Sequence, residues 1–128
     1  MGFWASLFGV GNQASFRKID WLEVEGKIRS LEALSMQKDQ ANAKQLIIQA
    51  DILVDSITKQ AGVKGATFGE RLKSLRGKID RSVYSNLWQA HIKRNELVHD
   101  HGSFVAEWEK SKYYQAFKDA ISAMRGLR

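Results

Sequence analysis

The sequence contains no cysteine and no proline in its 128 residues. Without cysteine, disulfide bonds and thiolate metal sites are excluded, and a reducing cytoplasm is the compartment that we expect. Because proline interrupts helices, its absence favours long unbroken ones. The chain also lacks internal repeats, a glycine-rich phosphate loop and strand-forming runs. No apolar run reaches the roughly 20 residues that a membrane-spanning helix needs.

The residues that are present have the composition of one globular helical domain. Hydrophobic residues make up 44% of the chain and charged residues 27%, and the ten glycines lie mostly between periodic segments. A chain of this length can bury one core but is too short for two comfortable domains. We therefore expect an all-α fold, an antiparallel bundle of four or five helices, in a single domain at residues 16–128.

Residues 1–15 differ in composition and form a separate apolar segment. The large side chains of its uncharged first ten residues fit one face of a two-turn helix: Phe3, Trp4, Leu7 and Phe8. The segment is too short to span a bilayer, and it lacks the charged start and the length of a signal peptide. Its apolar face can dock on the domain, pair two subunits, or make a weak contact with a membrane surface through residues 1–10. Docking or pairing is the interpretation that we prefer.

Capping residues and helical periodicity together place the helices. Asp20 and Thr67 each precede a glutamate at the spacing of an N-terminal capping box, and Ser103 has the position of a third cap. Gly62 follows the strongest periodic stretch and is expected to end it. The predicted helices occupy residues 21–35, 38–61, 68–75, 81–99 and 104–125.

The net charge of +6 comes from one part of the chain. Between Lys64 and Arg94 there are eight basic residues against two acidic ones, whereas residues 1–63 balance at seven against seven and residues 95–128 at five against five. A positive surface attracts RNA and raises its local concentration; a solvated basic loop is the alternative. The side chains that we expect to bind RNA or phosphate are Lys73, Arg76, Lys78, Arg81, Lys93 and His91.

Arg94 has an unusual position on its predicted helix. At about 100° per residue the polar side chains gather in a wedge, and Arg94 lies opposite, near the middle of the apolar arc. An unpaired buried charge is costly, so a partner must compensate it. One interpretation is an internal ion pair with Asp51 or Asp55. The other is that this side of the helix lines a cleft or a subunit interface, where Arg94, Asn95 and His99 meet a phosphate-bearing ligand.

Residues 94–99, Arg-Asn-Glu-Leu-Val-His, resemble the signature of the HEPN superfamily of small helical ribonucleases and nucleotide-binding domains. The motif falls late on a helix and follows Leu87, Trp88 and His91. The resemblance extends over roughly residues 20–125, and its diagnostic core is Arg-Asn-x-x-x-His. It implies a HEPN-like bundle and a metal-independent endoribonuclease of toxin or defence type that needs no cofactor. It also implies a homodimer and a possible antitoxin or nucleotidyltransferase-like partner.

The resemblance further implies a mechanism in which the ribose 2′-hydroxyl attacks the neighbouring phosphate and a cyclic phosphate is left. The catalytic residues are then Arg94, Asn95 and His99. Histidine suits proton transfer because its unperturbed pKa is near 6.5. Arginine suits the charge on the phosphorane because it stays charged and can bind two phosphate oxygens. An amide such as Asn95 can orient the phosphate or the imidazole.

The spacing within the motif favours two chains at one site. On a regular helix Arg94 and His99 point about 140° apart, with roughly 7.5 Å of axial rise between them. One copy therefore makes a poor pocket, whereas two antiparallel copies can bring Arg94 and Asn95 of one chain to His99 of the other. We expect catalysis to require a strong homodimer that acts on RNA.

Two other interpretations use the same residues. The alternative function is a non-catalytic HEPN-like module that binds RNA, nucleotide or a protein partner. A metal ion is the other possibility, since His99 and His101 bracket Asp100. No metal site is predicted, because two histidines around an aspartate at a helix end more often form a polar terminus.

Overall fold

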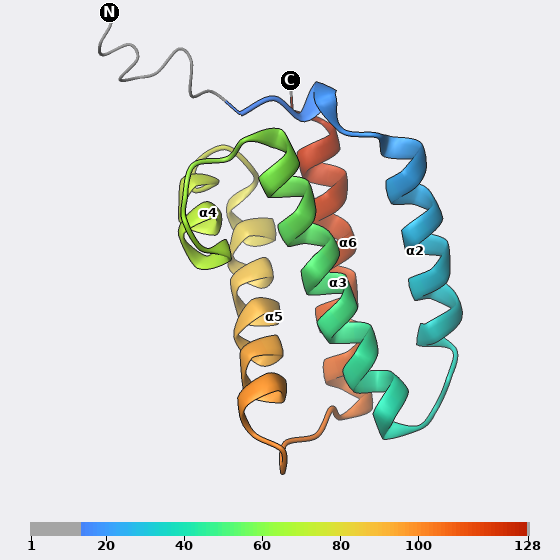
Figure 1. Ribbon diagram of the computed structural model, residues 1–128. Helices are drawn as coiled ribbons and strands as arrows, with labels where there is room; N and C mark the ends of the chain where they lie inside the picture. Colours follow the sequence, from blue (N-terminus) through green and yellow to red (C-terminus); the bar gives the residue numbers. More distant parts are fainter. Residues whose placement is uncertain (1–13, 128) are drawn as a thin grey trace, which may run out of the picture.

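The computed structural model describes residues 14–127, and this range contains helices and no β-strand (Figure 1). A short 3₁₀ turn, η2 (Phe16–Lys18), precedes α2 (Trp21–Ser35), α3 (Gln40–Ala61), α4 (Phe68–Ser74), α5 (Arg81–His99) and α6 (Glu107–Arg125). The expected all-α bundle is confirmed, whereas the HEPN-like topology and the homodimer stay predictions. The apolar segment expected at residues 1–15 lies outside the described residues except for its last two positions.

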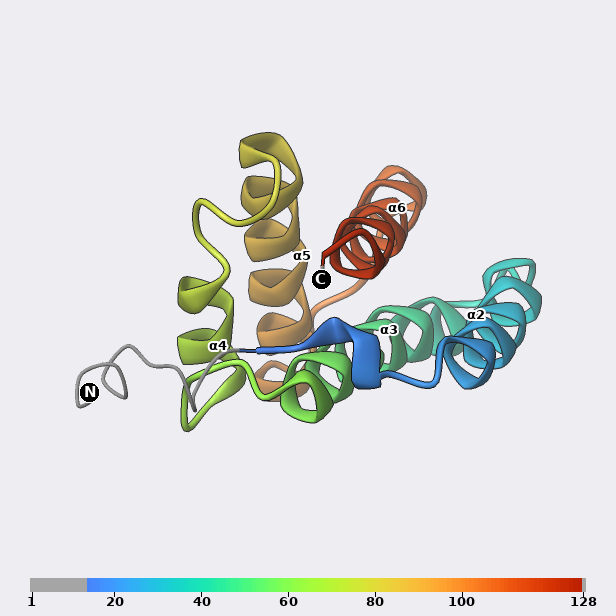
Figure 2. The ribbon, with the colours of Figure 1, turned by 90° about the horizontal axis from the view of Figure 1, so that it is seen from above.

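The central helix is α3, which packs against α2, α5 and α6. Consecutive long helices run in opposite directions (Figure 1), and α2 and α5 lie on opposite sides of α3 when the bundle is seen from above (Figure 2). The short α4 lies beside α5, next to the top of the bundle in Figure 1. None of the described helices is long and apolar enough to cross a membrane.

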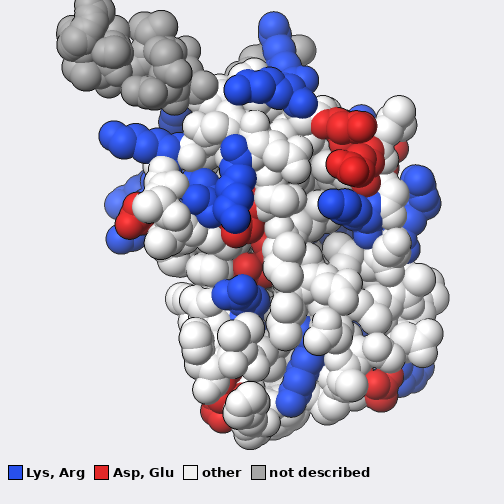
Figure 3. All heavy atoms as spheres, viewed as in Figure 1, with Lys and Arg blue, Asp and Glu red and all other residues white. Residues whose placement is uncertain are grey.

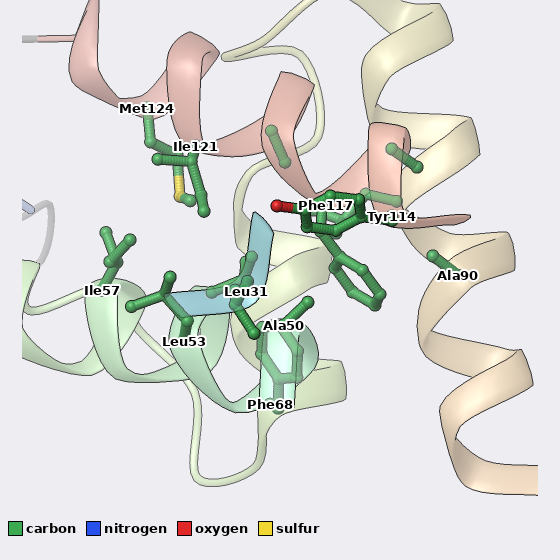
Figure 4. Packing of buried hydrophobic residues seen from close by; sticks show 14 of the residues in the cluster. Leu31, Ala50, Leu53, Ile57, Phe68, Ala90, Tyr114, Phe117, Ile121 and Met124 are labelled. Carbon is green, nitrogen blue, oxygen red and sulfur yellow. The ribbon is translucent and has the colours of Figure 1, made fainter. Parts of the chain in front are cut away.

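The core lies where the apolar stripes of the long helices meet. Leu53 and Ile57 of α3 face Ile121 and Met124 of α6 across this core (Figure 4). Removal of apolar side chains from water is the main term that favours such packing. Side chains with no exposed surface come from α3, α4, α5 and α6: Leu46, Ile47, Val54, Thr58, Leu72, Leu87, Phe117 and Met124. The core thus extends along α3, which also carries the carboxylate described below.

Local capping sets several helix ends, as expected. The carboxylate of Asp20 accepts a hydrogen bond from the backbone N–H of Glu23 at 3.2 Å, and the hydroxyl of Thr67 accepts one from Glu70 at 3.1 Å. Gly62 ends α3 in the left-handed conformation, with φ of 81°. These ends depend on groups within a few residues of one another, so the sequence alone could indicate them.

The start of α6 differs from the expected cap at Ser103. The Ser103 hydroxyl donates instead to the carbonyl of Asp100 at 2.7 Å. The side chain of Gln40 pairs with the backbone of Val105, since it accepts from the N–H at 2.8 Å and donates to the carbonyl at 2.6 Å. The helix begins at Glu107, where the backbone N–H of Ala106 donates to the carboxylate of Glu109 at 2.9 Å.

Candidate functional site

A buried carboxylate joins α3 to the motif helix α5. Asp51 is only 2% exposed, and its Oδ2 lies 2.8 Å from Nδ1 of His91. Its Oδ1 lies 3.5 Å from Nε of Arg94. Burial raises the pKa of Asp51, while the hydrogen bond with His91 and the charge of Arg94 act in the opposite direction. Asp51 therefore positions two side chains of α5 at once.

His91, expected to bind RNA or phosphate, lies inside the fold. It is 7% exposed, and its ring packs edge-on against Phe68 at 4.8 Å and Trp88 at 5.9 Å between centroids. When Asp51 is ionised, Nδ1 of His91 donates to it and Nε2 is the nitrogen left for any other partner. The histidine thus links the buried carboxylate to the aromatic side chains between α4 and α5.

Arg94 combines features of both interpretations that its position on the helix allows. It lies against Asp51, as the ion-pair interpretation expects, but 29% of its side chain is exposed. One of its terminal nitrogens donates to Oδ1 of Asn95 at 3.0 Å. Its buried Nε has no hydrogen-bond acceptor among the described residues, because Asp51 at 3.5 Å is farther away than an ordinary N–H···O bond allows. The charge of Arg94 is compensated while part of its donor capacity is unused.

Arg71 shows what a purely structural arginine looks like in this fold. Its guanidinium donates to the carboxylate of Asp55 at 2.5 Å, to the hydroxyl of Thr58 at 3.3 Å and to the carbonyl of Gly65 at 3.0 Å. Only 7% of its side chain is exposed. Asp55, the other carboxylate considered for Arg94, is thus the partner of Arg71. The two arginines differ clearly, since each of the three guanidinium nitrogens of Arg71 has an acceptor within the protein, whereas Arg94 makes one hydrogen bond among the described residues.

His99 lies at the C-terminal end of α5 and is exposed. It has no hydrogen bond or ion pair with any residue in the described range. Asn95, one turn earlier, is half-buried and accepts from Arg94. A single chain therefore brings Arg94 and Asn95 together and leaves His99 apart, in agreement with the angular separation worked out from the sequence. Whether a second chain completes the site stays a prediction.

The face of α5 that carries Asn95 and His99 also carries an exposed apolar side chain. Ile92 is 60% exposed and lies seven residues before His99, so the two share a face, with Asn95 between them. A single exposed apolar side chain is ordinary at a protein surface, so Ile92 marks this face of α5 without identifying what covers it.

Of the six predicted RNA-binding residues, four are exposed, whereas His91 and Lys93 are buried. Lys73, Arg76, Lys78 and Arg81 lie at the surface around α4 and the start of α5. Figure 3 shows lysine and arginine side chains gathered over the α4 side of the molecule. Lys93 is instead buried, at 7% exposure.

The ammonium group of Lys93 is occupied by the fold itself. Its Nζ lies 3.2 Å from carboxylate oxygens of both Glu96 and Glu109 and donates to the carbonyl of Phe104 at 2.9 Å. Burial alone lowers the pKa of Lys93, but the bonds to Glu109 and Glu96 outweigh burial and the net shift is upward. All three N–H groups have partners, so Lys93 joins α5 to the start of α6.

The end of α5 has the features of a polar terminus. The Asp100 carboxylate accepts from the backbone N–H of Gly102 at 2.9 Å, and His99 and His101 are both exposed. Within residues 14–127, no group of three or more histidine, aspartate or glutamate side chains is arranged to hold a metal ion. The residues that remain for phosphate chemistry are those of the motif and the exposed basic side chains.

Two aromatic residues belong to this region although they were not among the side chains expected to bind RNA or phosphate. Tyr84 and Trp88 lie one turn apart on α5, with ring centroids 6.4 Å apart. Their spacing of four residues, within the basic segment, was a signal for a stacking surface. No protein-family model matches the chain, and neither does any curated protein or solved structure with which it was compared. The HEPN resemblance therefore depends on the motif and its helical setting.

Proposed function

We propose that this protein is a HEPN-like, metal-independent endoribonuclease of toxin or defence type that acts as a homodimer. The observation that carries the proposal is that the charge of Arg94 is compensated while its guanidinium stays partly free to bind a ligand. Asp51 compensates its charge and fixes its direction, yet the terminal nitrogens of Arg94 make only one hydrogen bond within the described residues, to Asn95, and 29% of its side chain is exposed. An arginine held in this way is preorganised for an anion, because its position is fixed before the ligand arrives.

The active site would be completed by the second chain. Arg94 and His99 point in different directions on one helix, and His99 is exposed without a partner in the described range. An antiparallel α5 from a second copy would place its His99 near Arg94 and Asn95 of the first. The same contact would cover the exposed side chain of Ile92.

The chemistry follows from the side chains available. His99 in its neutral form accepts the proton of the ribose 2′-hydroxyl, whose oxygen then attacks the adjacent phosphorus. The guanidinium of Arg94 stabilises the additional negative charge on the phosphorane, and Asn95 orients the group that it contacts. The bond to the 5′-oxygen breaks, that oxygen takes up a proton, and the products carry a 2′,3′-cyclic phosphate and a 5′-hydroxyl.

A second candidate is a non-catalytic module that binds RNA, nucleotide or a protein partner. The observation that favours it is that His99, unlike His91, has no side chain that orients its imidazole within the described part of the chain. A general base normally needs such an orienting partner. This candidate predicts binding that depends on Arg94, with no cleavage of RNA.

The first experiment is cleavage of a mixed RNA pool by purified protein in the presence of a chelator. His99→Ala and Arg94→Ala should each reduce cleavage by at least about 100-fold, the usual effect of removing a general base or a charge-stabilising group. The matched controls His101→Ala and Arg29→Ala change exposed residues of the same types and should retain the activity. Equal cleavage by His99→Ala and wild type would exclude the proposed mechanism, and intact RNA with a folded dimer would favour the binding module.

A mixed dimer tests whether the two chains share the site. Co-expression of the Arg94→Ala and His99→Ala chains produces some dimers in which one composite site holds an intact Arg94 and an intact His99 from different chains. If pairing is random, about a quarter of the wild-type activity should return, since half of the dimers are mixed and each has one working site. A site within a single chain predicts no recovery. Ile92→Glu should give monomers in sedimentation and abolish cleavage in parallel.

A further inference from the structure

A groove near the start of α5 is separate from the motif. It has a volume of about 520 Å³ and is formed by the turn between α4 and α5 together with the first two turns of α5. This volume lies within the range of roughly 300–1,000 Å³ that is usual for small-molecule sites. Its lining residues are Arg76, Gly77, Ile79, Arg81, Tyr84, Ser85 and Trp88.

One wall of the groove is aromatic. Tyr84 and Trp88 meet edge to face, with an angle of 75° between the ring planes, and both are half-buried. The ring of Trp88 packs against the ring of His91, and a hydrogen bond to Asp51 holds His91 in place. The aromatic wall is therefore rigid, and a rigid indole or phenol that faces a groove is suited to stacking with a nucleobase.

The groove is also positively charged. Arg76 and Arg81 are exposed, and neither has an ion pair with any described residue. The nearest acid in sequence, Asp80, caps α5 by accepting from the backbone N–H and the hydroxyl of Ser82. No acidic side chain lines the groove within the described range. Two free guanidinium groups beside an aromatic wall match a ligand that carries phosphates next to flat rings.

We propose that this groove binds single-stranded RNA, with a base stacked on Trp88 or Tyr84 and phosphates held by Arg76 and Arg81. A duplex keeps its bases stacked within the helix and offers only its backbone, so it uses the arginines but not the aromatic wall. A simple anion likewise has no use for the aromatic wall.

The groove lies on the same face of α5 as part of the motif. Trp88 and Asn95 are seven residues apart, which places them on one face with roughly 10 Å of axial rise between them. A strand stacked in the groove can therefore lead toward the Arg94 and Asn95 end of α5, as far as the edge of the face that the second chain would cover. This inference rests on the proposed function and adds to it that the substrate is single-stranded and is held beside the cleavage site.

The test uses a 2′-O-methyl oligonucleotide, which lacks the attacking hydroxyl and so cannot be cut by the proposed mechanism. Its binding to the wild-type protein, followed by fluorescence anisotropy, should exceed binding of the matching duplex. Trp88→Leu should weaken single-strand binding by about tenfold, as loss of one stacked base does, and leave duplex binding nearly unchanged. Intrinsic tryptophan fluorescence should be quenched by the oligonucleotide in wild type and much less in the variant.

A charge variant covers the case in which Trp88→Leu does not fold. Arg76→Gln with Arg81→Gln changes only exposed side chains and should lower the salt-dependence slope by about 1.4, or roughly 0.7 for each phosphate contact with a single strand. Arg17→Gln with Arg29→Gln removes the same charge elsewhere and serves as the control.

Two results would refute the proposal that the groove binds single-stranded RNA. One is equal binding of single strand and duplex, and the other is equal weakening by both double variants, since each indicates general electrostatic attraction. The groove proposal and the ribonuclease proposal can be refuted independently of each other. Cleavage of unmodified RNA without groove-dependent binding refutes only the groove, whereas groove-dependent binding without cleavage refutes only the ribonuclease.

Discussion

The difference between Arg71 and Arg94 gives the most direct test of why Arg94 is assigned to function. We consider replacement of each by methionine, which keeps much of the aliphatic stem and removes the guanidinium. Arg71→Met removes three hydrogen bonds from a buried position, one of them to the carboxylate of Asp55. Breaking a buried, hydrogen-bonded ion pair by removing one partner costs about 3–5 kcal/mol. We expect about 3 kcal/mol here, because Asp55 is 24% exposed and keeps Lys59 at 3.9 Å.

Arg94→Met should cost much less. Its one hydrogen bond is to the neighbouring Asn95, and 29% of its side chain is exposed. Asp51 loses a compensating charge, but it keeps its bond to His91 and its pKa is already raised by burial. We expect a loss of about 1 kcal/mol, near the upper end for a partly exposed pair.

The assay is urea unfolding followed by circular dichroism, with equal m-values as the check that both variants unfold from comparable native states. Arg29→Met, an exposed replacement on α2, is the control and should change stability little. A loss for Arg94→Met equal to or larger than that for Arg71→Met would refute the distinction. Arg94 would then be a structural residue, and its unused donor would carry no functional meaning.

The remaining predictions concern Asp51 and two glycines. Because the pKa of Asp51 is raised in the folded state, its contribution to stability is present below its unfolded pKa, about 3.9, and is lost as pH rises through the folded value. The unfolding free energy of the wild type should therefore fall across that pH window, and in Asp51→Asn this fall should be absent. Urea unfolding at a series of pH values measures it, and the same pH dependence in both proteins would contradict the prediction. At Gly65, with φ of 146°, a Cβ would lie 2.6 Å from the backbone nitrogen of Arg71, whereas at Gly62 it meets nothing within 4 Å. Gly65→Ala should cost about 3 kcal/mol and Gly62→Ala about 1 kcal/mol; equal losses in thermal or urea unfolding would show that the close contact is relieved without cost.

Much of the fold could be predicted from the sequence because it depends on neighbouring residues. The apolar periodicity predicted the long helices, and the caps at Asp20 and Thr67 and the stop at Gly62 were all confirmed. Each of these signals acts within one or two helical turns, so no knowledge of the rest of the chain is needed. The cap expected at Ser103 was wrong, because Ser103 bonds to the carbonyl of Asp100, Gln40 of α3 occupies the backbone of Val105, and α6 begins only at Glu107.

The partners of the charged side chains depended on packing instead. Asp51 and Asp55 lie one turn apart on α3, and the sequence could not show which of them faces Arg94 and which faces Arg71. Lys93 was expected to bind RNA or phosphate, yet α6 brings Glu109 to it and the side chain is buried.

The sequence by itself thus determined that the chain is helical, where most helices begin and end, and where positive charge and the Arg-Asn-x-x-x-His motif lie. Only the tertiary structure decided that Arg94 keeps an unused donor and that Arg76, Arg81, Tyr84 and Trp88 line one groove. The physical reason is the range of the interactions. Helix formation and capping act between near neighbours, whereas burial, ion pairing and groove shape depend on which helices pack together.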